Sequence, residues 1–138
     1  MSGIVRNILN NHLSGITMSA TIAWENVPFV PKPNENHVRV SFLPGTTRAA
    51  GNHKNAMDFE SGLYQIDVYV PQNQGTATAD SLATGVRAHF YRGLRLTDTN
   101  SNVVHVQQTP SVAPGAREGA FWRVRVTVPW FAYLPAAS

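Results

Sequence analysis

The chain has 138 residues, of which 43% are hydrophobic and 14% are charged, and this balance excludes a solvated disordered polymer. Eleven Lys and Arg residues against eight Asp and Glu residues give a net charge of +3, which is too mild to indicate nucleic-acid binding by itself. The absence of cysteine excludes disulfides, thiolate metal sites and cysteine nucleophiles. The length predicts a single domain over residues 1–138.

The N-terminal residues predict an amphipathic helix. Hydrophobic side chains recur at helical spacing on one stripe, and these are Val5, Ile8, Leu9 and Leu13. Ser2 is a candidate N-cap and Gly15 a candidate stop. Polar residues interrupt this segment before a signal-peptide core can form, and no apolar run approaches a membrane span. We therefore expect a protein made in a cytoplasm, without a membrane partner.

The next part of the chain predicts three strands and two irregular segments. Residues 20–24 form a short apolar run, and the segment 25–33 contains three prolines, which prevent a regular ladder. Hydrophobic and polar residues then alternate over 37–43 and again over 63–70, as in half-buried strands. Between them, residues 46–58 show no period and predict a long loop, which in compact domains is often functional.

The second half predicts one more helix and three more strands. The helix covers 75–90, with Thr76 as its cap and Gly93 as the left-handed residue after it. Residues 95–97 and 103–107 predict a hairpin. The last strand, about 119–129, follows a segment rich in proline and glycine.

These elements predict an α+β fold, a two-layer sandwich in the order α-β-β-β-α-β-β-β. Alternating strands have one covered face and one polar face, and two amphipathic helices suffice to cover one face of a mostly antiparallel mixed sheet of about six strands. The opposite face would display Arg39, Asp67, Arg123, Arg125 and His105. That face and the long loops are where function is to be sought.

The residue types that carry catalysis or bind metals do not form a recognisable motif. No two of the five histidines have the spacing that places two imidazoles on one metal ion. Asp58 and Glu60 could share a strand face for acid–base work, but such pairs more often solubilise a strand end. A hydrolase nucleophile turn and a phosphate-binding glycine loop are both missing. We therefore predict no enzyme, no catalytic residue, no metal and no cofactor, with a small hydrolase as the weakest alternative.

A nucleic-acid-binding module is the alternative that the basic residues suggest. Arg39, Arg123 and Arg125 could line the polar face, with Tyr69 and Phe121 as stacking rings. Asp67 shares that face and opposes this interpretation. We favour a solvated or subunit-facing surface over a nucleic-acid surface. A partner subunit also explains why Phe121, Tyr69 and Leu43 stand on the nominally wet side.

Several segments, taken in order, resemble the phage tail terminator-like family of minor tail proteins found in siphophages and prophages. The resemblance covers nearly the whole chain, except the loop 46–58 and the residues after 133. The segments are the short N-terminal helix, IAWENVPF at 22–29, VRVSFLP at 38–44, GLYQIDVYVP at 62–71, GTA at 75–77 with the helix to RAHF at 87–90, RLT at 95–97 and WRVRVTVP at 122–129.

The resemblance implies a non-enzymatic virion protein located in the tail. Such terminators form a ring, typically of six copies, on the head-proximal end of the tail tube, where the ring stops tube growth and offers a surface to the head. The implied partners are further copies of the chain, the tail tube protein and the head connector or head-closure protein, with DNA only as cargo passing through. The alternative within this class is another neck component, such as a head-closure or tail-completion protein.

A ring requires that each subunit present two different patches. The candidate interface residues fall into two groups, one on the polar sheet face and one in the loop 46–58. The first group is Arg39, Asp67, Arg123 and Arg125, and the second is Arg48, His53 and Lys54.

Overall fold

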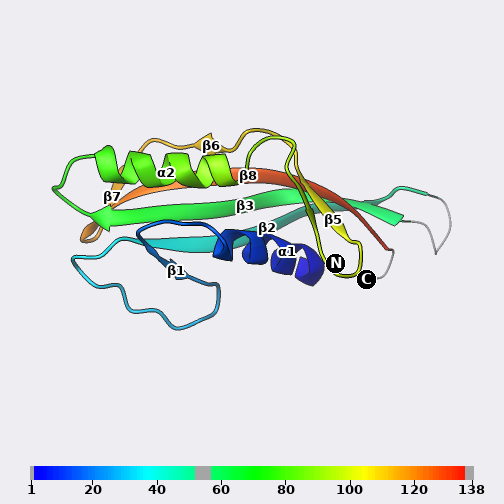
Figure 1. Cartoon of the computed structure of the whole chain (residues 1–138), viewed down its shortest axis with the longest axis horizontal. Coiled ribbons are helices and arrows are strands. Elements are labelled where there is room, and N and C mark those ends of the chain that lie inside the picture. The colour runs from blue at the N-terminus through cyan, green and yellow to red at the C-terminus, as the bar shows by residue number, and fades with distance from the viewer. Residues whose placement is uncertain (1, 52–56, 136–138) are drawn as a thin grey trace.

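The structure, a computed structural model, describes residues 2–51 and 57–135 and contains two helices and eight strands (Figure 1). In chain order these elements are α1 (Ser2–Ser14), β1 (Thr21–Ala23), β2 (His37–Ala49), β3 (Met57–Pro71), α2 (Ala77–His89), β4 (Arg95–Thr97), β5 (Val103–Val106), β6 (Ser111–Val112), β7 (Ala116–Glu118) and β8 (Phe121–Pro135).

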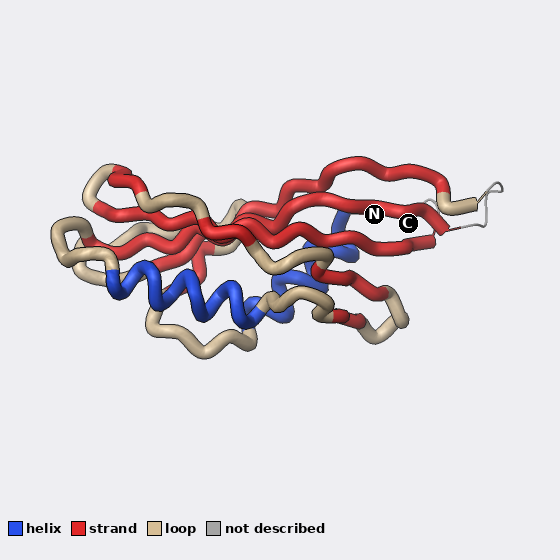
Figure 2. The backbone as a smooth tube through the Cα atoms, turned by 90° about the horizontal axis from the view of Figure 1, so that it is seen from above, coloured by secondary structure: helices blue, strands red, loops and turns tan. Residues whose placement is uncertain are grey.

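The strands form one sheet in the order β1-β2-β3-β8-β5-β4, with the short strands β6 and β7 also paired to β8. Among the strand pairs of the described residues, β1–β2 alone is parallel. The sheet curls into a half-barrel, and both helices lie on its inner side (Figure 2). The predicted α+β class with a mixed sheet and two helices is confirmed. The predicted element order lacks β6 and β7, which the segment rich in proline and glycine supplies.

The core lies between the helices and the inner face of the sheet. Along β8 every second residue from Val124 to Leu134 is buried, because successive side chains of a strand point to opposite faces, whereas β3 is buried on both faces from Ile66 to Pro71. Tyr64 is buried in β3, and its hydroxyl donates a hydrogen bond of 2.6 Å to Asn10 Oδ1 of α1. The predicted stripe of α1 is buried as well, and the core includes Val5, Leu9, Leu13, Val38, Val40, Ile66, Ala79, Ala83, Val86, Val124, Val126 and Trp130.

The predicted ends of α2 need two corrections. Gly93 has the expected left-handed φ of +85°, but it does not cap the helix, because α2 ends at His89 with Phe90 as its C-cap, and Gly93 N donates to the Val106 carbonyl at 3.0 Å. Thr76 occupies the N-cap position, but its side chain makes no capping hydrogen bond. Instead, the main-chain carbonyl of Thr76 accepts a hydrogen bond from Asp80 N at 3.0 Å.

The predicted loop 46–58 is wrong at both ends, because β2 continues to Ala49 and β3 begins at Met57. Pro44 and Gly45 resemble a stop, yet β2 passes through them with a register shift between Pro44 and Thr47. β1 pairs with β2 only as far as Arg39, so Pro44 lies where β2 is an edge strand, a position that tolerates proline. The backbones approach closely here, since a Cβ at Gly62 would collide with the Leu43 carbonyl and lie 2.9 Å from the Trp130 ring.

The predicted end of the last strand at Pro129 is also wrong, since β8 continues to Pro135. The carbonyl of Pro129 accepts a hydrogen bond from Gln107 N, so its nitrogen points to the same edge of β8. On that edge, pairing with β5 stops at Trp130 and pairing with β6 starts at Thr127. The proline therefore lies in the gap between two strands, where no N–H donor is needed.

Candidate subunit interface

The outer face of the sheet, turned away from both helices, carries the predicted polar side chains, and we call it the reverse face. Strand register places Arg39 of β2, Asp67 of β3 and Arg125 of β8 in one row across it. The neighbouring row is His37, Tyr69 and Arg123. We call these residues, together with Glu118 of β7, the polar end of the reverse face.

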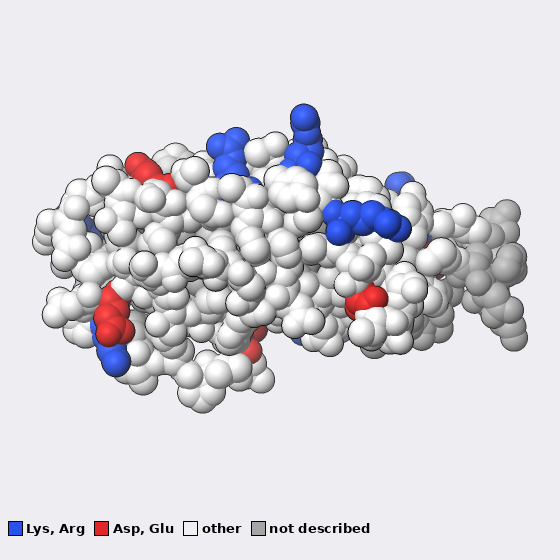
Figure 3. Space-filling view, viewed as in Figure 1, with Lys and Arg blue, Asp and Glu red and all other residues white. Residues whose placement is uncertain are grey.

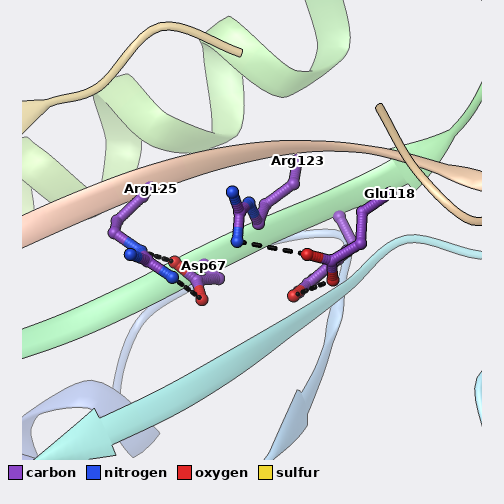
Figure 4. Close-up of polar contacts among 5 residues, drawn as sticks. Asp67, Glu118, Arg123 and Arg125 are labelled. Carbon is purple, nitrogen blue, oxygen red and sulfur yellow. Dashed lines mark hydrogen bonds and ion pairs between the residues drawn. The ribbon is translucent and has the colours of Figure 1, made fainter. Parts of the chain in front are cut away.

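Asp67 and Arg125 form a two-pronged ion pair across β3 and β8 (Figure 4). Arg125 Nε donates to Asp67 Oδ1 at 2.7 Å, and a second guanidinium nitrogen donates to Oδ2 at 3.2 Å. These hydrogen bonds and the carboxylate charge raise the pKa of Arg125. Asp67 is buried, with 7% of its surface exposed, which corrects the prediction that it is displayed.

Glu118 of β7 joins two residues of the neighbouring row, Tyr69 and Arg123. Its Oε2 accepts a hydrogen bond from the Tyr69 hydroxyl at 2.7 Å, and its Oε1 lies 3.1 Å from an Arg123 guanidinium nitrogen (Figure 4). Burial of the ring, together with the bond to the Glu118 carboxylate, raises the pKa of Tyr69 to about 12. Both arginines of β8 therefore have a carboxylate partner within the chain.

His37 lies buried at the margin of this end. Its ring stacks on Tyr69, with centroids 4.6 Å apart, and meets the edge of Phe121 at 4.9 Å. Desolvation and the nearby Arg39 charge both lower the pKa of His37. Phe29, from the proline-rich segment, approaches His37 at 5.2 Å and lies under the Arg39 guanidinium at 5.7 Å. The chain thus partly covers its own polar end, although Arg39 itself stays exposed.

The other half of the reverse face is apolar, and of its residues the sequence pointed only to Leu43 as a hydrophobic side chain on the polar side. Four of the eight large hydrophobic side chains that are exposed among the described residues lie there: Leu43, Met57, Leu63 and Tyr133. Phe59 packs between Phe131, at 5.9 Å, and Tyr133, at 5.2 Å. We call this set the apolar end, and it consists of Leu43, Met57, Phe59, Leu63, Phe131 and Tyr133. An exposed cluster of this kind is a common mark of an interaction surface.

Of the second predicted group of interface residues, only Arg48 is among the described residues. Arg48 belongs to β2, opposite Phe59, and its guanidinium lies over that ring at 4.9 Å. It therefore borders the apolar end and does not join the four charged residues at the polar end. His53 and Lys54 lie outside the described residues.

On the opposite face of the molecule, which carries the helices, Lys, Arg, Asp and Glu side chains are scattered over a largely uncharged surface (Figure 3). A groove of about 530 Å³ lies between α1 and the β4–β5 hairpin. No group of three His, Asp or Glu side chains arranged to hold a metal ion occurs within residues 2–51 and 57–135. Within the same ranges, no helix is long and apolar enough to cross a membrane.

The family model described as phage tail terminator protein matches residues 4–130. The chain belongs to this family. The terminator-like resemblance that the sequence motifs indicate is thus confirmed, and with it a structural role in a phage tail. Among curated proteins, no sequence matches this terminator. One solved structure superposes on it with a TM-score of 0.72 at 21% identity, over 96% of this chain and 95% of the other. At that identity, the likeness shows a shared fold alone.

Proposed function

We propose that this terminator forms a ring on the head-proximal end of the tail tube, where the ring stops tube growth and presents the surface that joins the head. Family membership supports a tail role. The apolar end of the reverse face is the observation that supports a specific contact surface. An ordered sheet exposes a contiguous group of large hydrophobic side chains there, as expected where a partner binds.

A closed ring of identical subunits, six by the family resemblance, needs a head-to-tail contact between two different patches. The apolar end is the first patch of the proposal. The second is the proline-rich segment 24–36, in which Val27 and Val30 are exposed, Val30 to 85%. This segment and the β2–β3 hairpin lie toward opposite ends of the molecule (Figure 1), so each subunit can offer one patch to either neighbour.

The charged candidates play a different part in this proposal. Asp67, Arg123 and Arg125 are engaged within the chain, so they stabilise the sheet on which the contact is built. A nucleic-acid surface needs basic side chains that are free to neutralise phosphates, and two of the three arginines proposed for that role already face carboxylates. DNA remains only cargo in this account.

The direct test adds the purified terminator to tail tube protein of the same phage while it polymerises. Tube lengths are measured by electron microscopy. Capping predicts shorter tubes with a ring on one end. Unchanged lengths without end-bound rings would contradict the proposal.

A pair of matched variants locates the contact. Leu63 in the apolar end and Val112 in β6 have nearly equal exposure, at 39% and 41%, and Val112 lies off the reverse face because it pairs with Val126 of the core side. Leu63→Asp should fold yet fail to shorten tubes, since a carboxylate would be buried without a partner in the contact. Val112→Asp should cap normally, and equal capping by both variants would remove the apolar end from the account.

A further inference from the structure

The groove between α1 and the β4–β5 hairpin combines an apolar floor with a polar rim. Ile4, Ile8 and Leu96 form its floor. Four carboxamide side chains line it as well: Asn7, Asn11, Asn100 and Asn102. A carboxamide offers a donor and an acceptor together, so this rim matches the main-chain groups of an extended polypeptide.

One wall of the groove is an unpaired sheet edge. β4 is the last strand in the sheet order, and no strand in the described part of the chain pairs with its outer side. Two main-chain hydrogen bonds flank the ladder between β4 and β5: Val106 N donates to the Leu94 carbonyl, and Asp98 N donates to the Asn102 carbonyl. Because bonded and non-bonded pairs alternate along an antiparallel ladder, Leu96 and Val104 form the bonded pair between them. The N–H and C=O groups of Arg95 and Thr97 therefore point away from β5.

Both walls are fixed in place by the chain. Asp98 holds the hairpin turn, since its Oδ1 accepts bonds from Asn100 N and Asn102 N, each at 2.9 Å. On the other side, α1 is tied to α2 through stacked imidazoles, in which His12 and His89 each bond to the other's main-chain carbonyl, at 2.8 and 2.6 Å. A site with preset walls loses little conformational freedom on binding.

We propose that this groove binds an extended segment of a partner protein as an additional strand on β4. The segment bonds to the outward main-chain groups of Arg95 and Thr97, and Asn7 and Asn11 bond to its far edge. A side chain that points to the same face as Leu96 enters the apolar floor, so the segment carries an apolar residue at that position. Three paired residues span about 10 Å at the usual rise per residue. The groove lies on the helical side of the sheet, so the inference does not depend on ring formation.

The test uses overlapping synthetic peptides of 12 residues that span the tube and head-joining proteins encoded by the same phage. Binding is measured by fluorescence anisotropy and mapped by ¹⁵N chemical shifts on the full chain. The proposal expects at least one peptide to bind and to shift the amides of Arg95 and Thr97. If no peptide binds, or if the shifts map elsewhere, the proposal is overturned.

Two substitutions at one position separate main-chain pairing from side-chain contact. Thr97→Pro removes the outward N–H and leaves every β4–β5 ladder bond, because the Thr97 N–H does not point to β5. It should weaken peptide binding about tenfold, equivalent to about 1.4 kcal/mol. Thr97→Val keeps the N–H and should bind as the unmodified chain does. Equal binding by both variants would refute strand addition.

A third variant keeps the test valid if Thr97→Pro unfolds. Asn11→Ala removes one carboxamide from the rim, and it should not unfold α1, since alanine is the better helix former. It should weaken peptide binding about threefold, equivalent to about 0.65 kcal/mol. Unchanged binding would contradict the proposed role of the rim. The unmodified chain could instead form dimers that Thr97→Pro abolishes. That result would show that the β4 edge pairs with a second copy of the chain, and it would also overturn the proposal.

Discussion

The two ends of the reverse face differ in whether their side chains have partners within the chain. At the polar end, Asp67, Arg125, Arg123 and Glu118 find partners in the chain, and Phe29 covers His37. At the apolar end, Leu43, Leu63 and Tyr133 remain exposed on the same strands. A row of charges therefore does not mark an interface when neighbouring strands already neutralise it. The uncovered hydrophobic group is the stronger indication of a missing partner.

The ion pair should dominate stability at the polar end. Asp67→Ala leaves the Arg125 guanidinium without its partner and should lower the free energy of unfolding by about 2 kcal/mol, as for a bond to a charged group. The urea midpoint measures the loss. A drop below about 0.5 kcal/mol would mean that the pair is solvated and that the polar end is free to bind.

Two histidines, His37 buried and His12 partly buried, should make stability depend on pH. Burial lowers the pKa of His12 and of His37, so the unfolded chain binds more protons than the folded chain once the pH falls below about 6.5. Stability should therefore fall between pH 7 and pH 5. His37→Phe keeps a ring stacked on Tyr69 and should reduce this slope. An unchanged slope would show that His37 does not titrate as inferred.

The Glu118 bond can be followed through Tyr69. Glu118→Gln removes the carboxylate charge, so the pKa of Tyr69 should fall from about 12 toward its ordinary value without reaching it, because burial is the larger cause. Ultraviolet titration of the phenolate, with Tyr69→Phe as the reference, isolates this group. A pKa that stays near 12 would remove Glu118 as a cause.

Arg39 provides the smallest effect. It is exposed, its guanidinium lies over the Phe29 ring, and its charge acts on His37, so Arg39→Ala should change the free energy of unfolding by about 0.5 kcal/mol or less. Tube capping should also be unchanged. A loss of capping would move the contact to the polar end.

Alternation in the sequence was sufficient to predict the core face, including Val40, Ile66 and Val126, because one covered face requires a period of two. It was insufficient to find the strand ends, because Pro44 and Pro129 read as stops when their pairing edges are unknown. Most of the apolar end was missed with those strand ends, since Phe59, Phe131 and Tyr133 lie beyond them, and only Leu43 and Leu63 fall within the predicted strands. The charged row was found, but the pairing of Asp67 with Arg125 depends on the β3–β8 register, which one strand alone cannot specify.

The chain contains no cysteine, so single thiols can report which end is covered on the tube. Leu63→Cys and Arg39→Cys are each labelled with a maleimide, first as free protein and then bound to tube ends. The account predicts that binding slows labelling at position 63 at least about tenfold, as expected for a residue buried in a contact, and leaves labelling at position 39 nearly unchanged. Protection at position 39 with free reaction at position 63 would contradict it.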